Sequence, residues 1–380
     1  MEPLVIVGSG LAGYSLAREL RKLDAAVPLT ILSRDDASFY SKPMLSNALA
    51  SGKSAAQIAS ASAEQMAAQL GARIVAGIEV EAIDGASRTL HAGGEAIRYS
   101  KLVLALGADP VALPLEGNGA SDIMRVNDLQ SYARFRTAIE GKTTVALLGA
   151  GLIGCEFAND LAGVGYKVHV VDPAPLPLGR LLPAAAAQRL QTALAAMGVV
   201  WHLETTAKAV TRDAEGLQLE LADGTRFAAD AVLSAVGLRP RTRLAQGAGL
   251  KVERGIVTNR LLQTSVANIY ALGDCAEVEG FSLPYVLPLM QAARALAKTL
   301  IGTPTPVVYP AMPVVVKTPA MPAVVCPPPA VPGAWATQQD ADGIEARFED
   351  LGGKLLGFAL VGSAIARKQA LTKLAPPLLS

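Results

Sequence analysis

The chain has 380 residues, of which 51% are hydrophobic and 18% charged, with 35 glycines and 24 prolines. This length exceeds what one ordinary core holds, so two or three domains are expected. The net charge of +1 gives no general reason to bind nucleic acid. The three cysteines form no close pair, which argues against a disulfide framework and a redox dithiol. The three histidines have no metal-ligand spacing, so no metal site is predicted.

The N-terminal half of the chain begins with a βαβ pattern. It predicts a strand at 4–7, a helix at 11–23 and a strand at 29–32. A helical stretch near 55–70 precedes short β segments over 73–104. The apolar run "LVLALG" is typical of a buried parallel strand that ends at Gly107 and Pro110.

A second βαβ pattern runs from Val145 to Asp172. It is followed by a predicted helix at 183–197 and β segments over 199–236, which end in "AVLSAVG". The two halves therefore repeat one plan, and this internal duplication is the main organisational feature of the sequence.

The remainder of the chain predicts one more helix and a third region. A strand in "IYALGD" precedes a helix at 289–300, and from residue 304 the composition shifts to Pro and Val. Strands are expected in "PVVVK", "EARFED" and "LLGFALVG", with a last helix near 363–374. The prolines and Lys317 in the apolar run 309–336 exclude a membrane span. With no leader-like segment before Leu4, the cytoplasm is the expected location.

The first glycine motif lies between the first strand and helix. Its residues are Gly8, Ser9, Gly10, Leu11, Ala12 and Gly13. In a G-x-G-x-x-G turn the first glycine permits the tight turn and the second lets a pyrophosphate approach. The third lets the helix pack on the strand. A plain glycine turn is the alternative, but the βαβ context favours a dinucleotide at the helix N-terminus.

The second motif has the same context and consists of Gly149, Ala150, Gly151, Leu152, Ile153 and Gly154. Its second strand ends at Asp172, where an acid accepts hydrogen bonds from both ribose hydroxyls and repels a 2′-phosphate. This predicts NADH rather than NADPH. The first unit has Ser33 and Arg34 at that place, with Asp35 and Asp36 beyond. Either an aspartate reaches the ribose or, as we favour, Arg34 packs over the adenine and contacts phosphate.

Three further motifs resemble those of the FAD-dependent pyridine-nucleotide reductases, and the resemblance extends over the whole chain. They are "LALGADP" (104–110), "LIGCE" (152–156) and "TSVANIYALGDCAEV" (264–278). The resemblance implies an α/β fold like that of glutathione reductase, with two three-layer Rossmann-like domains and a C-terminal α+β domain. The expected boundaries are 1–110 with 238–303 for FAD, 111–237 for NADH and 304–380 for the last domain.

The resemblance also assigns cofactor contacts residue by residue. Asp274 would bind the FAD ribitol, Lys42 the phosphates or ring, and Val80 the adenine through its backbone. Val286 would border the flavin from the loop before the 289–300 helix. The remaining expected FAD residues are those of the first glycine motif with Ser33, Arg34, Pro43, Ala105, Gly107, Glu156 and Lys317, and the NADH residues are Gly149, Gly151, Leu152, Ile153, Gly154 and Asp172.

The electron acceptor follows from what the sequence lacks and from the same resemblance. The peroxidase and oxidase branch of the family carries a redox cysteine where this chain has Asn47. "YSKPMLS" and "MPVVVKTPAMPAVV" (312–325) resemble the branch that passes electrons singly to rubredoxin, a small acidic iron protein, in alkane hydroxylation. Ferredoxin reductases and nitric-oxide-related reductases of the family are the alternative, and a redox sensor without turnover is a third hypothesis. A monomer is expected.

Two residues are candidates for a catalytic role. Lys317, isolated in an apolar stretch, would stabilise the negative charge near N1 and O2 of reduced flavin, because a buried lysine needs an anion. The alternative is a lysine on an edge strand that points to water. The resemblance implies that Glu156 lies where flavin and nicotinamide meet, and the alternative is a carboxylate that only supports the first helical turn. Lys42, Lys53, Arg294 and Lys317 are candidates for steering an acidic partner.

Overall fold

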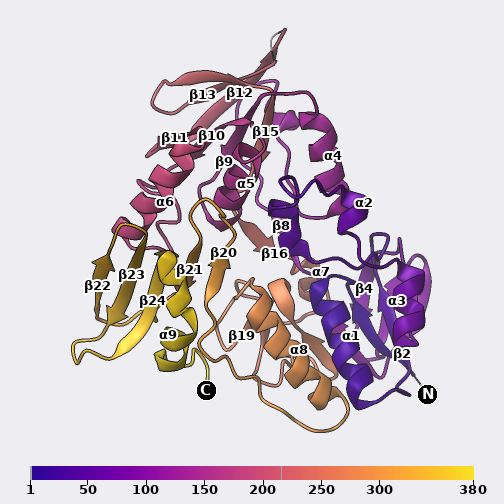
Figure 1. Ribbon diagram of the computed structural model, residues 1–380. Coiled ribbons are helices and arrows are strands. Elements are labelled where there is room, and N and C mark those ends of the chain that lie inside the picture. The colour runs from indigo at the N-terminus through magenta and orange to yellow at the C-terminus, as the bar shows by residue number, and fades with distance from the viewer. Residues whose placement is uncertain (1, 215) are drawn as a thin grey trace.

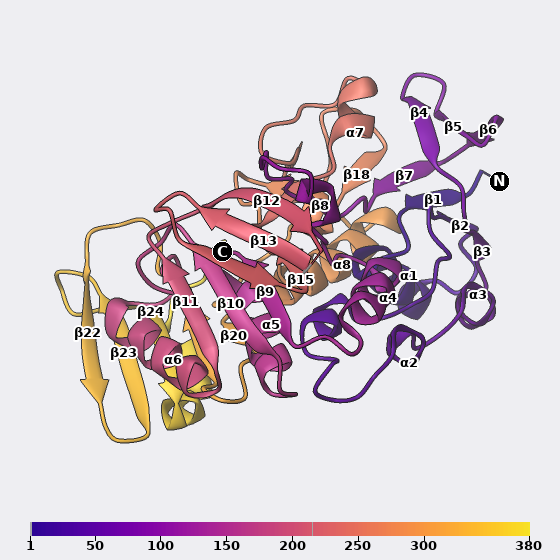
Figure 2. The ribbon, with the colours of Figure 1, turned by 90° about the horizontal axis from the view of Figure 1, so that it is seen from above.

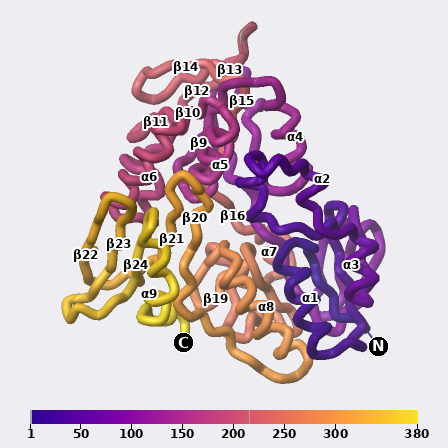
Figure 3. Tube along the Cα trace, viewed as in Figure 1, coloured from indigo at the N-terminus to yellow at the C-terminus, as the bar shows by residue number. Residues whose placement is uncertain are grey.

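The computed structural model describes residues 2–214 and 216–380. Figure 1 shows three regions: the N-terminal segments with the orange segment around α8, the magenta segments around β9–β15, and the yellow C-terminal sheet. We call them the first unit, the second unit and the C-terminal region. The trace in Figure 3 shows that the chain leaves the first unit, builds the second and returns before it builds the C-terminal region.

The first unit is built on a five-stranded parallel sheet. Its order is β18 (Ile269–Ala271), β7 (Lys101–Leu104), β1 (Leu4–Val7), β2 (Leu29–Leu32) and β3 (Arg73–Val75). All four residues of β1 are buried because both faces of the sheet are covered. One face packs against α1 (Leu11–Leu23), α3 (Ala63–Leu70) and α8 (Val286–Leu300).

The other face of this sheet packs against an antiparallel meander. The meander consists of β4 (Val80–Asp84), β5 (Thr89–Ala92) and β6 (Glu95–Arg98). Val5, Val7 and Leu32 of the sheet share a core with Val80 and Leu90 of the meander. The unit therefore has three layers: helices, parallel sheet and meander.

The second unit repeats these three layers. Its parallel sheet has the order β11 (Val199–Leu203), β10 (Lys167–Asp172), β9 (Thr144–Leu148) and β15 (Ala231–Ser234). Helices α5 (Leu152–Ala162) and α6 (Ala184–Ala196) pack on one face. The meander β12 (Ala207–Asp213), β13 (Gly216–Leu221) and β14 (Arg226–Ala229) covers the other, as Figure 2 shows from above.

Short elements join the two units. The chain enters the second unit after β8 (Ala108–Pro110) and returns through β16 (Leu238–Pro240), and these two strands pair antiparallel. Helix α4 (Leu129–Ile139) packs beside α2 (Ala55–Ile58), so it links the units as well. The returning chain adds α7 (Arg243–Gly247) and the parallel pair β17 (Ile256–Thr258) and β19 (Ala276–Val278).

The C-terminal region is an antiparallel five-stranded sheet with one short helix. Its order is β20 (Val314–Val316), β21 (Ala323–Cys326), β24 (Leu355–Gly362), β23 (Gly343–Glu349) and β22 (Ala334–Gln339), with α9 (Lys368–Leu374) after the last strand. The face with Val316, Val325 and Ala346 packs against the helices of the second unit. Among the described residues, no helix combines the length and the apolar character needed to cross a bilayer.

The expected α/β class with two repeated dinucleotide-type units is confirmed, but several local predictions were wrong. The helix expected at 289–300 begins at Val286, so Val286 lies in its first turn and not in the loop before it. Pro288 does not prevent this, because the first-turn N–H groups of a helix have no intrahelical partner. The expected final helix is a 3-10 helix at Ser363–Arg367 followed by α9. Helix α4, which starts at a capping box on Asp128, was not predicted.

Candidate functional site

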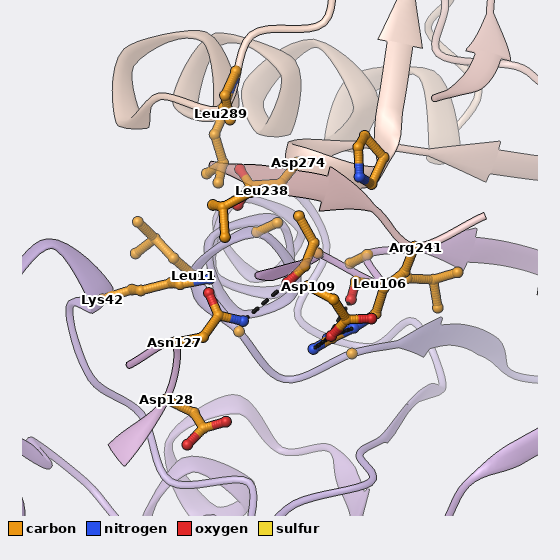
Figure 4. Close-up of a pocket in the computed structure, with 18 of the residues that line it drawn as sticks. Leu11, Lys42, Leu106, Asp109, Asn127, Asp128, Leu238, Arg241, Asp274 and Leu289 are labelled. Carbon is orange, nitrogen blue, oxygen red and sulfur yellow. Dashed lines mark hydrogen bonds and ion pairs between the residues drawn. The ribbon is translucent and has the colours of Figure 1, made fainter. Parts of the chain in front are cut away.

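One large cavity lies where the two units and the C-terminal region meet. Its volume is about 1500 Å³, and residues of all three regions line it. Figure 4 shows side chains from opposite walls directed into it, among them Lys42, Asn127, Leu238 and Asp274. A cavity of this size and extent suits a large, elongated ligand rather than a small metabolite.

The first glycine loop forms one end of the cavity, and steric requirements explain its sequence. Gly8 has φ +115°, and a Cβ there would lie 2.2 Å from the Ala105 carbonyl oxygen. A Cβ on Gly13 would lie 1.9 Å from the Gly8 oxygen, so only glycine lets α1 pack this close to the loop. At Gly10, by contrast, no atom of the described residues lies within 4 Å of the Cβ position. The missing side chain leaves open space into which a phosphate can enter.

The second glycine loop repeats this geometry. Gly149 has φ +108°, a Cβ on Gly154 would lie 1.9 Å from the Gly149 oxygen, and the Cβ position of Gly151 has open space within the described part of the chain. Helix α5 starts at this loop and directs its free N–H groups toward it. The residues of both loops therefore fit a dinucleotide pyrophosphate, on backbone geometry alone.

The strand-end residues of the two units differ. Asp172 accepts hydrogen bonds from the backbone N–H groups of Ala150 (2.6 Å) and Ala174 (2.8 Å), so it fixes the second loop from behind. In the first unit Ser9 and Ser33 hydroxyls are 2.6 Å apart, and Ser33 donates to Asp35 (2.5 Å). The exposed Arg34 lies 3.7 Å from Asp109. An adenine contact by Arg34 and a ribose contact by an aspartate both stay open.

Most of the residues expected to bind a cofactor line the one cavity. They are Gly8, Ser9, Gly10, Leu11, Ala12, Ser33, Arg34, Lys42, Pro43, Val80, Ala105, Gly107, Leu152, Ile153, Glu156, Asp274, Val286 and Lys317. The remaining five do not line it: Gly13 lies under the first loop, and Gly149, Gly151, Gly154 and Asp172 lie around the second. The tertiary fold thus brings together positions more than 300 residues apart in the chain.

An ion pair between the second unit and the C-terminal region lies at the cavity wall. Glu156 on α5 is completely buried, and its Oε2 lies 2.8 Å from Lys317 Nζ and 2.5 Å from Ser46 Oγ. Lys317 Nζ also donates to Ser46 Oγ (2.9 Å) and to the Pro43 carbonyl, and its backbone N–H donates to Glu156 Oε1 (3.0 Å). Removing the Lys317 charge would leave the Glu156 carboxylate buried without its cationic partner.

This cluster shows where both side chains point, while their roles at a cofactor stay predictions. Lys317 follows β20, which is an edge strand, yet its side chain points to Glu156 and not to water. Glu156 lies beyond the first turn of α5, and its carboxylate bonds to Lys317 and Ser46 instead of to that turn. The contacts thus differ from both alternatives, a lysine that points to water and a glutamate that supports the first helical turn, and the expected roles of Lys317 and Glu156 at the flavin stay predictions.

Lys42 and Asp274 lie on opposite walls of the cavity (Figure 4). Burial lowers the pKa of Lys42, while the negative charge of Asp274 acts in the opposite direction. Lys42 begins the 3-10 helix Lys42–Ser46 and Asp274 lies in the 3-10 helix Gly273–Cys275. A cation and an anion on facing walls suit a ligand that carries phosphates and hydroxyls together.

The structure adds residues that sequence reasoning missed. Arg241 donates to Asp109 from Nε (2.7 Å) and from Nη2 (2.5 Å), and to the Leu106 carbonyl (2.8 Å). The guanidinium contributes to holding the pKa of Asp109 below its usual value, against an opposing effect of burial. Asn127 donates to the Ala108 carbonyl (2.9 Å). Arg241 lies shortly after "AVLSAVG", which repeats the pattern of "LVLALG" at the end of the second unit. This repeat was the sequence feature that could have indicated a site residue there.

The three cysteines are free and buried. Burial raises the pKa of Cys275 and of Cys326 to about 11, and that of Cys155 further. Thiols with raised pKa values are poor nucleophiles, so they suit packing rather than redox exchange. Within residues 2–214 and 216–380, no three His, Cys, Asp or Glu side chains gather as a metal site would require.

Comparison with known proteins identifies the chain's relatives. Residues 2–297 match the family pyridine nucleotide-disulphide oxidoreductase, and residues 306–375 match the rubredoxin binding C-terminal domain. The chain is 49% identical over 381 residues to a rubredoxin-NAD(+) reductase of Alcanivorax borkumensis, with 100% of both chains covered. It is 37% identical to a nitric oxide reductase FlRd-NAD(+) reductase of Vibrio vulnificus, with 96% of each covered.

A solved structure supports the same assignment. The ferredoxin reductase for the CYP199A2 system from Rhodopseudomonas palustris superposes with a TM-score of 0.89 at 25% identity, covering 99% of this chain and 96% of that one. The family match over most of the chain agrees with the structure, which has two glycine loops of the same geometry and a large cavity between the units. The chain belongs to the pyridine nucleotide-disulphide oxidoreductase family.

Proposed function

We propose that this protein is an FAD-dependent reductase that takes hydride from NADH and passes electrons one at a time to rubredoxin. The observation that carries the proposal is the single cavity, which extends from the first glycine loop to the start of α5 and to β20. Bound FAD would supply the step from a two-electron donor to a one-electron acceptor. The 49% identity to a rubredoxin-NAD(+) reductase over the whole chain supports this choice of acceptor.

FAD would occupy the first unit. Its pyrophosphate would lie against Gly10 and the N-terminus of α1, where space and free N–H groups coincide. Asp274 would accept hydrogen bonds from ribitol hydroxyls, and Lys42 would contact the phosphates or the ring. The flavin end would then reach Pro43, Val286 and Lys317, which line the same cavity.

NADH would bind to the second loop, with its pyrophosphate against Gly151 and its ribose on Asp172. Leu152, Ile153 and Glu156 of α5 line the cavity, so the nicotinamide would enter along this helix. The carboxylate of Asp172 would repel a 2′-phosphate, which favours NADH over NADPH.

Lys317 would place its positive charge at the flavin, with Glu156 and Ser46 fixing its position. A fixed cation stabilises the negative charge that reduced flavin carries. Replacement Lys317→Met should therefore make the flavin midpoint potential more negative, measured by anaerobic dye titration. A potential equal to that of the unaltered protein would remove Lys317 from this role.

Rubredoxin would dock beside the C-terminal region, which matches the rubredoxin binding domain over residues 306–375. Of the basic residues expected to steer an acidic partner, Lys42 and Lys317 line the cavity, whereas Lys53 and Arg294 do not. Exposed apolar side chains at the cavity, among them Leu287 and Val315, would add a contact surface.

The test is an anaerobic acceptor panel with NADH. The purified protein should be yellow, bleach with NADH under nitrogen, and reduce rubredoxin much faster than ferredoxin. Equal or faster turnover with ferredoxin would favour the alternative of a ferredoxin reductase. A preference for a nitric oxide reductase as acceptor would favour the alternative that the 37% identical relative suggests. Full FAD occupancy without turnover on any acceptor would indicate a redox sensor.

The remaining assignments are proposals of the same kind. We divide the chain into an FAD domain (1–110 with 238–303), an NADH domain (111–237) and a C-terminal domain (304–380), since each sheet falls within one of these ranges. Supply of electrons to an alkane hydroxylase, a cytoplasmic location and a monomeric state stay predictions.

A further inference from the structure

Helix α5 carries a second set of buried polar residues beyond Glu156. Asn159 and Asp160 are both buried, and they follow Glu156 by three and four positions. Residues at this spacing lie on one face of a helix. Burying a carboxylate and an amide is costly unless hydrogen bonds replace the lost water. Their partners therefore indicate what this face is for.

Asp160 bonds to the segment that follows the 3-10 helix Lys42–Ser46. Its Oδ2 accepts from the Leu49 N–H and its Oδ1 from the Ala50 N–H, each at 2.9 Å. Burial raises the pKa of Asp160, and these two N–H groups act in the opposite direction. The carboxylate thus ties the second unit to the segment whose other end provides Pro43 and Ser46, two partners of Lys317.

Asn159 bonds to the other segment that meets at the ion pair. Its Oδ1 accepts from the Ala320 N–H at 3.1 Å. Ala320 lies three residues after Lys317, in the turn between β20 and β21. One face of α5 therefore holds the 46–50 segment and the 317–320 segment against each other, with the Glu156–Lys317 pair between them.

We propose that Asp160 is a positioning residue for Lys317, and that Asn159 assists it. Asp160 fixes the backbone at Leu49 and Ala50, which sets where Ser46 and Pro43 lie, and these two residues with Glu156 set where Lys317 Nζ lies. The proposal rests on the proposed function, because it takes the Lys317 ammonium to act on the flavin. It adds a residue that does not line the cavity and acts on Lys317 through the backbone at Leu49 and Ala50 and through its negative charge.

The test variant is Asp160→Asn, which keeps the volume but leaves one acceptor for two N–H groups. The matched control is Asp230→Asn. Asp230 also accepts from two consecutive N–H groups in the same unit, those of Thr143 (3.0 Å) and Thr144 (2.9 Å), but with the single oxygen Oδ2. It does not line the cavity and makes no contact with the Lys317 cluster in the described chain.

Three measurements on the FAD-loaded proteins separate positioning from general destabilisation. They are the flavin midpoint potential from dye titration without NADH, the rate of flavin bleaching against NADH concentration by stopped flow, and the thermal unfolding midpoint. Asp160→Asn should shift the potential in the same direction as Lys317→Met. It should slow bleaching at saturating NADH at least fivefold and leave the NADH dissociation constant within twofold. Asp230→Asn should change only the unfolding midpoint.

The outcomes that overturn the inference are distinct from those that overturn the proposed function. Equal potentials and bleaching rates in Asp160→Asn and Asp230→Asn would refute positioning, even in a protein that reduces rubredoxin. A protein that fails with rubredoxin, or that NADH does not bleach, would refute the proposed function, while the potentials would still decide on Asp160. If Asp160→Asn does not load FAD, Asn159→Ala serves in its place. A shift smaller than that of Lys317→Met but in its direction supports the inference, and no shift refutes it.

Discussion

The two glycine loops have nearly the same backbone and different surroundings. In each loop the first glycine has a φ above +100°, and the third could not carry a Cβ without meeting a carbonyl oxygen at 1.9 Å. The second glycine faces open space in both. Yet the first loop lies in the shared cavity, whereas the glycines of the second loop lie outside its lining.

The strand that follows each loop accounts for the chemical difference. Asp172 bonds to the backbone N–H of Ala150, so a single carboxylate fixes the second loop. In the first unit no single carboxylate bonds to the loop backbone in this way among the described residues. Ser9 of the loop instead bonds to Ser33, which bonds to Asp35. The comparison teaches that glycine sterics give both loops the same backbone although the strand-end side chains that support them differ, and we propose that these side chains set the nucleotide preference.

The largest expected effect comes from the third glycine of each loop. Gly13→Ala and Gly154→Ala would each force a Cβ against a backbone oxygen, at a cost above about 3 kcal/mol. We expect Gly13→Ala to yield protein without FAD, and Gly154→Ala to retain FAD but resist bleaching by NADH. Flavin absorbance per chain and anaerobic NADH titration measure the two effects. The same defect in both variants would contradict separate roles for the loops.

Substitution of the second glycine separates binding from folding. Gly10→Ala and Gly151→Ala place the methyl group in open space, so the free energy of unfolding without cofactor should change by less than about 0.5 kcal/mol. The methyl group would occupy the approach of the pyrophosphate. Gly10→Ala should weaken FAD and Gly151→Ala should weaken NADH, each by roughly tenfold or more. Titration calorimetry with each nucleotide measures both affinities. Weaker FAD binding in Gly151→Ala, or weaker NADH binding in Gly10→Ala, would contradict the assignment of the loops.

The strand-end acid offers a test of nucleotide preference. Asp172→Ser removes the carboxylate from the ribose and from the Ala150 N–H, so the NADH dissociation constant should rise about tenfold. The discrimination against NADPH should fall at the same time, because the negative charge is gone. Unchanged affinity for NADH would refute the ribose role of Asp172. Asp230→Asn again serves as the control for a lost carboxylate in the same unit.

A smaller effect distinguishes the second unit from the first. His169 and His202 share a hydrogen bond of 3.0 Å beneath the ring of Phe227, where the meander meets the parallel sheet. Burial lowers the pKa of His169 to about 4 and lowers that of His202 as well. Since the unfolded histidine has a pKa near 6.5, stability is complete above that pH and decreases as the pH falls toward 4.

The pH effect can be measured on the whole protein. Between pH 7 and pH 5 the free energy of unfolding should fall by about 1–2 kcal/mol more in the unaltered protein than in His169→Gln. Denaturant unfolding at several pH values gives this difference. The same pH dependence in both proteins would show that the histidine pair does not titrate in this way.

The amino-acid sequence by itself determined the two βαβ units, their glycine loops and the parallel strands. The units, loops and strands depend on local sterics and on hydrophobic periodicity, which can be recognised in segments of about ten to thirty residues. The start of α8 at Val286 and the helix α4 were missed because helix ends depend on capping and packing. The residue types expected at the site were identified from motifs, each within its own segment.

Only the tertiary structure decided how those segments meet. No local pattern predicts that Lys317, just after an edge strand of an antiparallel sheet, points toward Glu156 and Ser46. Nor does any pattern indicate that Asp160 accepts hydrogen bonds from the N–H groups of Leu49 and Ala50, which lie 111 and 110 positions earlier in the chain. Such contacts arise because a buried charge is stable only beside a hydrogen-bonding or oppositely charged group. Which group lies beside it depends on how distant segments pack, and packing is a property of the whole fold.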